Sequence, residues 1–476
     1  EYIYNELDQL QEIHDGGRCI TAFKYNDDGT IKEAVSANGM KNLYGYDTDK
    51  NLIKLDIDFN GEILAQNRYT YDHNGNRTEK QQLQGTTYYT YDSINQLTNV
   101  KYPDYEEQLF YDKAGNRSKR IVNDVTEHYL YDKRNRLIRQ VFKQPTGTTA
   151  KHYIYDNAGS LMNDGEKVYK NDGFNRVTQV TNNKGQVQIN RYDAEGLRYE
   201  MEENKKLVQF IFNENREVVV EQSNSDIKRL IRSYDLWASE SEPEKTWYHY
   251  ASDEQGSTIF ITDEDKICNK YDYDAWGNLT TCEEIIPNRY LYTGQQFDQI
   301  TQQYYLRARY YNPVIARFTQ EDIYRGDGLN LYTYCDNNPV IYYDPSGYAC
   351  NPKLKNIYEK QQQTLPSRRG AFREAKRDLG IPITQQPYEI KKPEMKEPEY
   401  AGGHVIKDKN GKVIKTREYY FRKYNPKEDK YETYVIQDHS AGHEKGNQGP
   451  HFNVRPIENR RNGDVIGTKQ HYPFKK

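Results

Sequence analysis

A short tyrosine-rich motif recurs through most of this chain and limits what the chain can fold into. The clear copies are YGYDTDKNL at 44, YTYDHNGNR at 69, YTYDSINQL at 89, FYDKAGNR at 110, YLYDKRNRL at 129, YIYDNAGSL at 153, RYDAEGLR at 191 and YDYDAWGNL at 271. In the first six, the tyrosine before the aspartate advances by 25, 20, 20, 20 and 24 residues. A period in this range is typical of stacked repeats, in which each unit packs on its neighbours.

Each copy has the pattern of a β-hairpin. Alternating Tyr-x-Tyr predicts a strand with its aromatic rings on one face, and Asp-x-x-Gly-Asn predicts the turn that follows. The 46 tyrosines against 14 phenylalanines suit such a surface, because a tyrosine ring can be buried while its hydroxyl keeps a polar partner. A single hairpin is marginal in water, so we expect neighbouring hairpins to pair into one long continuous sheet and predict a mainly β fold.

Charge is divided unevenly along the chain. After Tyr348, the last 128 residues hold 27 Lys and Arg against 16 Asp and Glu, whereas the rest of the chain holds 40 against 55. A basic block suits a polyanionic partner such as nucleic acid, although a solvated lysine-rich surface is the alternative. The five cysteines include no C-x-x-C pair, which argues against a disulfide scaffold or a cysteine-based zinc finger.

The sequence shows neither a membrane-spanning pattern nor a targeting pattern. No stretch approaches the about 18 apolar residues that would cross a bilayer, so we predict no integral membrane segment. The chain opens at Glu1 without a charged-then-apolar leader. We therefore expect either that a targeting segment has been removed or that the chain is a fragment.

A denser set of motifs follows the repeats. Residues 289–348 contain YTGQ, YYLRARYYNP, ARFTQED, GLNLYTYCDNNP and DPSG in this order. Together with the repeats, these motifs resemble the RHS or YD-repeat proteins over about residues 1–348, and the motif-rich segment resembles the RHS-associated core. Ala316, where the family usually has Gly, and Ile323, where it usually has Pro, depart from the family pattern.

The resemblance implies a repeat sheet that spirals into a hollow shell, with a core that closes it and cuts the chain after the DPxG motif. The residues that it indicates are Asp322 and Asp344, with the scissile bond at Tyr348–Ala349. Two carboxyls forced together do not both ionise cheaply, so one can donate a proton while the other activates water or a backbone group. The alternative is that residues 344–347 merely form a turn. Because family shells are larger, we expect this chain to hold only the downstream part of one.

A nucleophilic role for Cys350 is a further alternative, although no histidine lies near it in sequence. The predicted domains are a YD-repeat shell at 1–284, the core at 285–348 and a C-terminal domain at 349–476. In the last of these, residues 366–380 predict a capped helix with Ala371, Phe372, Ala375 and Leu379 on one face. Proline breaks in 385–399 predict an extended linker.

Strand patterns occupy the middle of the C-terminal domain. The DKNGK segment at 408–412 predicts a hairpin turn, and TREYYFRKY at 416 and YETYVIQ at 431 predict two further strands. The second strand runs into QDHSAGHEKGNQGPHFNVRP at 437–456. This stretch contains histidines, acidic and amide side chains, and glycines. Glycines let a backbone fold around an ion or approach a phosphate.

Imidazole and carboxylate groups in this stretch predict hydrolytic chemistry. Asp438 and His439 end the predicted strand, where one can hold a divalent cation and the other can take a proton from water. His443, His451 and Asn453 follow within the next 14 positions and can return as further ligands. Nitrogen and oxygen ligands of this kind suit Mg²⁺, Mn²⁺ or Zn²⁺.

The HSAGH and GPHFNVRP motifs, with SRRGAFREAKRDLGIPITQQP and GTKQHYPF, resemble the HNH/endonuclease VII superfamily over about residues 365–476. The resemblance is to the nuclease domains that end bacterial polymorphic toxins, and it implies a small α+β His-Me finger domain. It implies His439 as general base, Asp438 and His451 as metal ligands, His443 as a further ligand or phosphate contact, and Asn453 as the residue that orients His439.

Guanidinium groups near this stretch are candidate phosphate contacts, because they match phosphate oxygens in pairs. They are Arg455, Arg460 and Arg461. Each of the histidines and arginines has the plainer alternative of a structural hydrogen bond or a surface charge. For His404, which lies outside the cluster, that plainer role is the one we expect.

The sequence as a whole indicates the C-terminal part of an RHS-repeat toxin, secreted or delivered from the cell surface to act in the cytoplasm of a target cell. DNA is the favoured substrate and RNA the close alternative. We expect an acidic immunity protein, the toxin's own shell and secretion machinery as partners. The other classes left open are a cell-surface adhesion or carbohydrate-binding repeat protein and a nucleic-acid-binding module without catalysis.

Overall fold

The computed structural model describes residues 1–224, 226–323, 330–352, 371–372, 375–376, 379, 381, 385, 387–394, 405, 413, 415–425, 430–439, 451–457 and 472–473. The chain forms two compact units, Glu1–Ile357 and Tyr358–Lys476. In the described part of the chain, no helix is long and apolar enough to cross a membrane.

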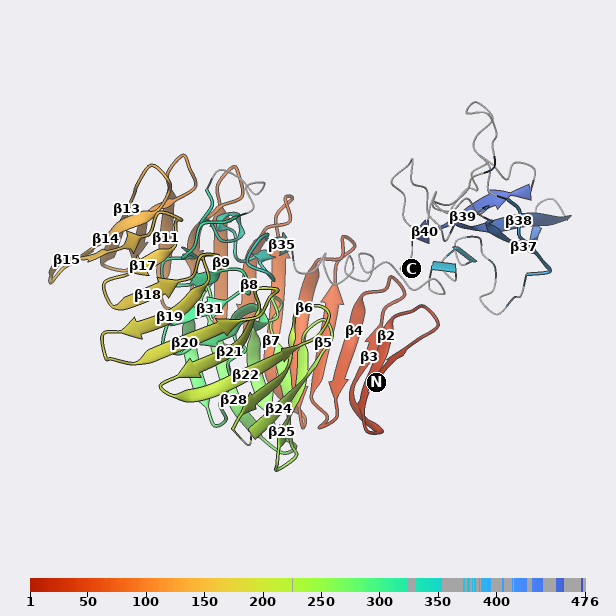
Figure 1. Cartoon of the computed structure of the whole chain (residues 1–476), viewed down its shortest axis with the longest axis horizontal. Coiled ribbons are helices and arrows are strands. Elements are labelled where there is room, and N and C mark those ends of the chain that lie inside the picture. Colours follow the sequence, from red (N-terminus) through yellow and green to blue (C-terminus); the bar gives the residue numbers. More distant parts are fainter. Residues whose placement is uncertain are drawn as a thin grey trace. The chain divides into compact units, whose positions relative to one another are not determined.

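An antiparallel sheet of 15 strands begins the first unit, and its strands pair in chain order (Figure 1). They are β1 (Tyr2–Tyr4), β2 (Leu10–Asp15), β3 (Arg18–Tyr25), β4 (Ile31–Ser36), β5 (Lys41–Tyr46), β6 (Leu52–Phe59), β7 (Glu62–Tyr71), β8 (Arg77–Gln82), β9 (Gly85–Tyr91), β10 (Leu97–Lys101), β11 (Glu106–Tyr111), β12 (Arg117–Val122), β13 (Val125–Tyr131), β14 (Leu137–Gln144) and β15 (Gly147–His152).

A second antiparallel sheet of 14 strands follows, again paired in chain order. They are β16 (Ile154–Tyr155), β17 (Leu161–Asn163), β18 (Lys167–Asn171), β19 (Val177–Asn182), β20 (Val187–Tyr192), β21 (Arg198–Glu203), β22 (Lys206–Phe212), β23 (Val218–Ser223), β24 (Asp226–Arg232), β25 (Leu236–Glu242), β26 (Thr246–Ser252), β27 (Thr258–Thr262), β28 (Ile267–Tyr273) and β29 (Leu279–Glu284).

The repeat builds these sheets as its sequence predicts. In the copy at 89, Asp92 Oδ1 accepts hydrogen bonds from the backbone N–H groups of Ile94 at 3.0 Å and Gln96 at 2.9 Å, which closes the turn. Asn95 in this turn has a φ of +64°, a conformation that Asn and Gly adopt at little cost. Tyr91 is half-buried and donates its hydroxyl to the Arg77 carbonyl at 2.6 Å. The predicted hairpins and their polar tyrosine contacts are confirmed.

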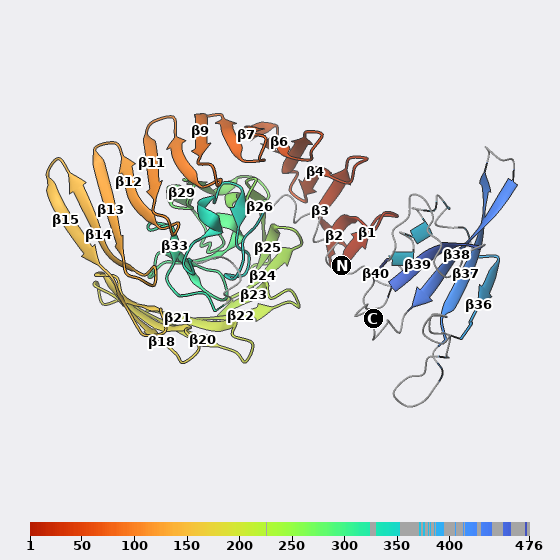
Figure 2. The ribbon, with the colours of Figure 1, turned by 90° about the horizontal axis from the view of Figure 1, so that it is seen from above.

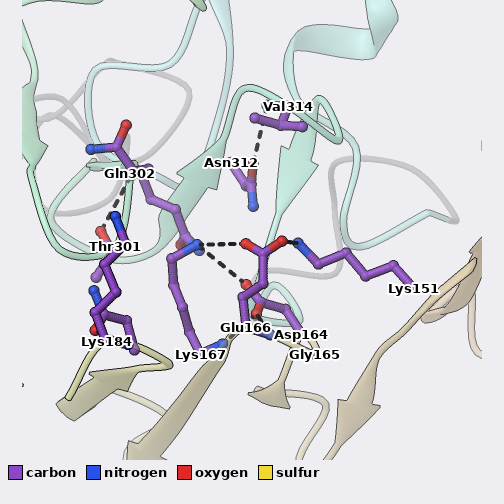
Figure 3. Close-up of polar contacts among 12 residues, drawn as sticks. Lys151, Asp164, Gly165, Glu166, Lys167, Lys184, Thr301, Gln302, Asn312 and Val314 are labelled. Atoms are coloured by element: carbon purple, nitrogen blue, oxygen red, sulfur yellow. Dashed lines mark hydrogen bonds and ion pairs between the residues drawn. The ribbon is translucent and has the colours of Figure 1, made fainter. Parts of the chain in front are cut away.

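The expectation of one continuous sheet is wrong in one respect, because the ladder stops between β15 and β16. Only Tyr153 joins these two strands, and one residue is too short for a hairpin turn. Charged side chains gather at this seam (Figure 3): Lys151 Nζ lies 3.1 Å from Glu166 Oε1, and Lys167 Nζ lies 3.7 Å from Asp164 Oδ2. Of these two ion pairs, Lys151–Glu166 links the two sheets, while Lys167–Asp164 lies within one turn of the second sheet.

The core segment lies inside the curve of the two sheets (Figure 2). Its elements are η1 (Tyr292–Gly294), β30 (Gln296–Asp298), β31 (Gln303–Tyr305), β32 (Tyr310–Asn312), β33 (Arg317–Phe318), η2 (Cys335–Asn337), β34 (Tyr342–Tyr343) and β35 (Asn351–Pro352). The strands β30 to β33 form one four-stranded sheet, and β34 pairs with β35.

Three core side chains bind the same turn position in three consecutive repeats. The contacts are Asn338 Nδ2 to Asn76 Oδ1 at 2.9 Å, Asn337 Nδ2 to Gln96 Oε1 at 2.9 Å, and Asn330 Nδ2 to Asn116 Oδ1 at 2.7 Å. Deeper in the unit, Arg198 of β21 pairs with Asp298 of β30, and both side chains are fully buried. The core is thereby fixed to the repeats by paired polar groups and by a shared aromatic cluster.

The second unit contains a five-stranded antiparallel sheet in the order β36 to β40. Its strands are β36 (Glu389–Lys391), β37 (Arg417–Asn425), β38 (Lys430–His439), β39 (His451–Pro456) and β40 (Tyr472–Pro473). The two strands predicted at 416 and 431 are confirmed as β37 and β38. The segment predicted as a linker at 385–399 also contributes to the sheet, because β36 pairs with the edge of β37.

A helical segment packs on one face of this sheet. Residues 371–372 and 375–376 are helical. The buried cluster that joins the segment to the sheet comprises Ala371, Ala375, Leu379, Ile381, Phe421, Ile436, Phe452 and Val454. This confirms the predicted apolar face, while the predicted ends of the helix and most of the DKNGK hairpin lie outside the described residues.

Candidate functional site

Two buried aspartates meet at one arginine in the core. Arg309 Nη2 lies 2.8 Å from Asp322 Oδ2 and 3.8 Å from Asp344 Oδ2. Asp322 is 5% exposed, Asp344 1% and Arg309 6%, so the three groups interact with little screening from solvent. The structure thus brings together the two carboxyls that the sequence indicated as a pair.

Asp344 also organises the DPSG turn. Its Oδ1 accepts hydrogen bonds from the backbone N–H groups of Ser346 at 2.9 Å and Gly347 at 2.7 Å, while Oδ2 is the oxygen nearer Arg309. Burial raises the pKa of Asp344, although these backbone donors and Arg309 oppose the shift. A turn and a carboxyl pair are therefore present together, and the turn alternative does not exclude the paired one.

Arg309 is the member of this site that sequence reasoning missed. Its Nε donates to the Gly347 carbonyl and its Nη1 donates to the Leu331 carbonyl at 3.1 Å. The guanidinium carbon also lies 3.6 Å from the centre of the Phe318 ring. The signal was available in YYLRARYYNP, where an arginine inside an aromatic strand pattern needs a buried charged partner.

Gly347 fits this site because it has no side chain. Its φ is +78°, and a Cβ there would lie 2.7 Å from the Leu306 carbonyl oxygen and 2.9 Å from the Arg309 backbone nitrogen. The backbone after Asp344 therefore passes close against the segment between β31 and β32 that carries Arg309. Tyr348, which follows, is 38% exposed.

The chain on both sides of Tyr348–Ala349 belongs to one small ladder. Tyr343 pairs with Asn351, and Tyr342 pairs with Pro352. Cys350, considered as a nucleophile above, lies beside Asp336, with its Sγ 3.6 Å from Asp336 Oδ2. The residues just after the predicted scissile bond are thus held by the core itself.

In the second unit, the register of β38 and β39 places the predicted catalytic residues at the end of a ladder. His439 pairs with His451, Asp438 with Phe452, and Gln437 with Asn453. The His439–His451 pair is at the end of this ladder, because β38 ends at His439 and β39 begins at His451.

Alternation along the strands separates two predicted ligands. Asp438 pairs with Phe452, whose ring belongs to the cluster under the helix, and His451 is the next residue along β39. Adjacent residues of a strand point to opposite faces, so Asp438 and His451 leave opposite faces of the sheet. Both residues still lie within the last two pairs of the ladder.

Buried polar side chains cover the face of the sheet away from the helix. His451 is 2% exposed, Asn453 6% and Arg455 9%. On β37, which β38 separates from β39, Glu418 accepts hydrogen bonds from Tyr420 Oη at 2.7 Å and from Gln437 Nε2 at 2.8 Å. Imidazole, amide and carboxylate groups with this little exposure form a donor set that fits a divalent cation in its chemistry.

Several predicted site residues lie outside the described residues: His443, Arg460 and Arg461, together with the side chain of His439. Among the described residues, three His, Cys or acidic side chains with donor atoms within 4.8 Å of one another occur at Glu12, His14 and Cys19 of β2 and β3. His14 Nε2 lies 2.7 Å from Glu12 Oε2. This group was not singled out from the sequence, because it forms only across two strands.

The fold and the C-terminal residues both match known families. Residues 83–340 match the sequence model of the teneurin YD-shell, and residues 405–474 match that of the HNH/Endo VII superfamily nuclease toxins. Because the first match covers more than half of the chain, the chain belongs to the YD-shell family. The C-terminal part of the chain belongs to the HNH/Endo VII nuclease toxins.

Curated relatives include proteins with much longer chains. The tRNA nuclease WapA of Bacillus subtilis strain 168 is 32% identical over 369 residues, which is 73% of this chain and 15% of WapA. The double-stranded DNA deaminase toxin A of Burkholderia cenocepacia is 31% identical over 132 residues, 26% of this chain and 9% of that toxin. This chain therefore spans less than a sixth of either relative.

Solved structures share the fold. The crystal structure of TcdB2-TccC3 matches with a TM-score of 0.56 and 18% identity, over 73% of this chain and 21% of the other. The Photorhabdus luminescens Tc holotoxin pore matches with a TM-score of 0.55 and 17% identity, over 74% and 20%. At these identities the likeness shows the shell fold alone.

Proposed function

We propose that this chain is the downstream part of a toxin that cleaves itself after Tyr348 and thereby frees a metal-dependent nuclease, with the domain limits 1–284, 285–348 and 349–476. The observation that chiefly supports the cleavage is the placement of Asp322 and Asp344 around the Arg309 guanidinium. The nuclease rests on the HNH/Endo VII match and on the His439–His451 pair.

The cleavage assigns a different role to each carboxyl. Because burial raises the pKa of Asp344, this group keeps its proton more readily and acts as the acid. Asp322, which lies 2.8 Å from Arg309, stays ionised and takes the proton of a water molecule that attacks the Tyr348 carbonyl carbon. Asp344 then protonates the Ala349 nitrogen as the peptide bond breaks.

In the freed domain, His439 takes a proton from the water that attacks the phosphorus atom. The proposed ligands of the divalent cation are Asp438, His443 and His451, and because Asp438 and His451 leave opposite faces of the sheet, they would have to meet around the end of the ladder. The cation, when bound, would stabilise charge on the phosphate and on the leaving oxygen. Asn453 orients His439. Arg455, with Arg460 and Arg461, binds the phosphates on either side of the scissile bond.

DNA is the first substrate proposed, because a domain with 27 basic and 16 acidic side chains attracts any polyanion and a duplex has the highest charge density. RNA is the second candidate, and the printed name of WapA as a tRNA nuclease favours it. The same site serves both, since each reaction breaks a phosphodiester bond.

The proposed partners follow from the danger of such an activity to its producer. An acidic immunity protein would cover the basic domain, and the acidic shell, with 40 basic against 55 acidic side chains, would retain the cleaved domain. Secretion machinery would deliver the toxin to the cytoplasm of a target cell.

The test separates cleavage from nuclease activity. Purified chain should resolve on a reducing denaturing gel into a repeat fragment and a tail of roughly 15 kDa by chain length, with Ala349 as the new N-terminus. Residues 349–476 should cut plasmid DNA or transfer RNA with Mg²⁺, Mn²⁺ or Zn²⁺ and not with EDTA. An intact chain after long incubation would contradict the first step. Cutting that is indifferent to EDTA would contradict the second.

A further inference from the structure

Two cysteines lie on either side of the proposed cleavage bond and close together in space. Cys335 belongs to η2 in the core, and Cys350 is the second residue after the bond. Cys350 packs against the buried cluster that contains Cys335, and its Sγ lies 3.6 Å from Oδ2 of Asp336, the residue next to Cys335. Both are thiols in the structure.

The local backbone fixes this arrangement. The ladder of Tyr343 with Asn351 and Tyr342 with Pro352 holds the segment that carries Cys350 against the core. Burial raises the pKa of the Cys335 thiol well above its ordinary value, and after burial the charge of a Cys350 thiolate is the largest cause. This effect agrees with the Asp336 contact and the ladder, which place Cys350 beside the residue next to Cys335.

We propose that Cys335 and Cys350 form a disulfide that keeps the cleaved nuclease covalently attached to its shell until a reducing compartment is reached. The inference rests on the proposed cleavage after Tyr348, because only then does this bond join two separate chains. It concerns a modification of the core that the cleavage itself does not need.

The chemistry proceeds by thiol–disulfide exchange with a disulfide oxidant such as oxidised glutathione. Cys350 is the half-buried thiol and attacks the oxidant first, so one glutathione leaves and a mixed disulfide forms. The Cys335 thiol, whose side chain is 3% exposed, then loses its proton and attacks Cys350 Sγ, and the second glutathione leaves. The two thiols of the protein lose two protons and two electrons, and one glutathione disulfide becomes two thiols.

The redox conditions inside and outside cells determine where this disulfide would persist. Disulfides persist outside cells and are reduced in the cytoplasm. Backbone pairing over two residue pairs is by itself a weak attachment. A disulfide would therefore prevent early loss of the nuclease during delivery, and reduction in the target cytoplasm would remove it.

The experiment uses the full chain after cleavage, treated with oxidised glutathione and analysed on paired denaturing gels. We expect one band near the uncut size without reductant and two bands with dithiothreitol. Cys335→Ser and Cys350→Ser should each give two bands on both gels. Cys282→Ser, which removes an exposed thiol of β29, is the matched control and should behave as the wild type.

Two outcomes would overturn the disulfide. One is two bands without reductant in the oxidised wild type, and the other is a linkage that survives in Cys335→Ser. Failure of cleavage is read separately, as a single band on the reducing gel. In that event, alkylation of the oxidised uncut chain should modify three of its five cysteines, and modification of all five would again overturn the proposal.

Discussion

Asp322 and Asp344 are 22 positions apart in the sequence, yet a carboxylate oxygen of each faces the same guanidinium nitrogen of Arg309, at 2.8 and 3.8 Å. The unequal distances favour charge on Asp322, the carboxyl closer to the arginine. Burial raises the pKa of Asp344 and so favours its protonated form. The two carboxyls therefore lie in different electrostatic environments, as an acid and a base require.

Removal of either carboxyl should stop the proposed cleavage. Asp344→Asn and Asp322→Asn should each slow it by roughly 10²–10⁴, the usual weight of a general acid or base. Glu321→Gln, which neutralises the carboxylate next to Asp322, is the matched control and should cleave at the wild-type rate. Time courses on a reducing gel measure all three rates. Wild-type cleavage in both Asn variants would remove the pair from the mechanism.

Arg309 should be required for its shape as well as its charge. Arg309→Lys keeps one positive charge but cannot reach the Gly347 carbonyl, the Leu331 carbonyl and Asp322 together. We expect cleavage at least about 100-fold slower, a loss comparable to that of one fixed electrostatic donor. Circular dichroism would check that the sheets persist. Rapid cleavage by a folded Arg309→Lys protein would show that the several simultaneous contacts of the guanidinium group are dispensable.

Local patterns predicted most of the first unit, because each hairpin is encoded within its own repeat. The turn at Asp92 and the strand before it could be read from about ten residues. The break at Tyr153 could not, since it depends on which strands meet at a seam. Arg309 was missed for a related reason. Its partners are distant in sequence, and no spacing rule links position 309 to positions 322, 331 and 347.

The C-terminal site was predicted in composition and only partly in geometry. The motif identified the histidines and placed Asp438 and His439 at a strand end, which the structure confirms. It could not give the register with β39, which depends on the length of the intervening loop. That register separates Asp438 from His451, and the pairing of β37 with β38 adds Glu418, a residue 20 positions upstream of Asp438.

The repeated tyrosine hydroxyl should stabilise each hairpin measurably. Tyr91→Phe removes the donor to the Arg77 carbonyl at 2.6 Å and leaves that carbonyl short of a partner. We expect a loss of about 1 kcal/mol in local stability, or about fivefold faster amide exchange in β9 and β10. Tyr88→Phe changes a tyrosine that is 47% exposed and serves as the control. Equal exchange in both variants would contradict a structural role for the hydroxyl.

Asp274 should make stability depend on pH between about 4 and 6. Burial, followed by the nearby charge of Glu107, raises its pKa to about 6. A folded pKa above the unfolded one gives stability that is complete below about pH 4 and is lost as pH rises through about 6. The free energy of unfolding of the wild type, minus that of Asp274→Asn, should therefore be about 1 kcal/mol larger at pH 5 than at pH 7.

Asp132→Asn is the control for this measurement. Burial opposes ionisation of Asp132, but hydrogen bonds from Arg136 outweigh it and lower the pKa. The difference between wild type and Asp132→Asn should then be the same at pH 5 and pH 7. Urea unfolding of the full chain, followed by tryptophan fluorescence, gives both comparisons. A pH-independent difference for Asp274→Asn would show that this carboxyl stays ionised.

In the nuclease, loss of a base and loss of a ligand should be distinguishable. His439→Ala should lower the rate by roughly 10²–10⁴ and leave the affinity for the cation unchanged, because a fully occupied site then lacks its proton acceptor. His451→Ala and Asp438→Ala should weaken cation binding, so excess metal should partly restore their rates. Plasmid and transfer RNA cleavage at increasing metal concentrations separates the two classes. His404→Ala, one residue before the matched range 405–474, should cut as the wild type does. If His439→Ala and His451→Ala both retain full activity, the active site lies elsewhere in the domain.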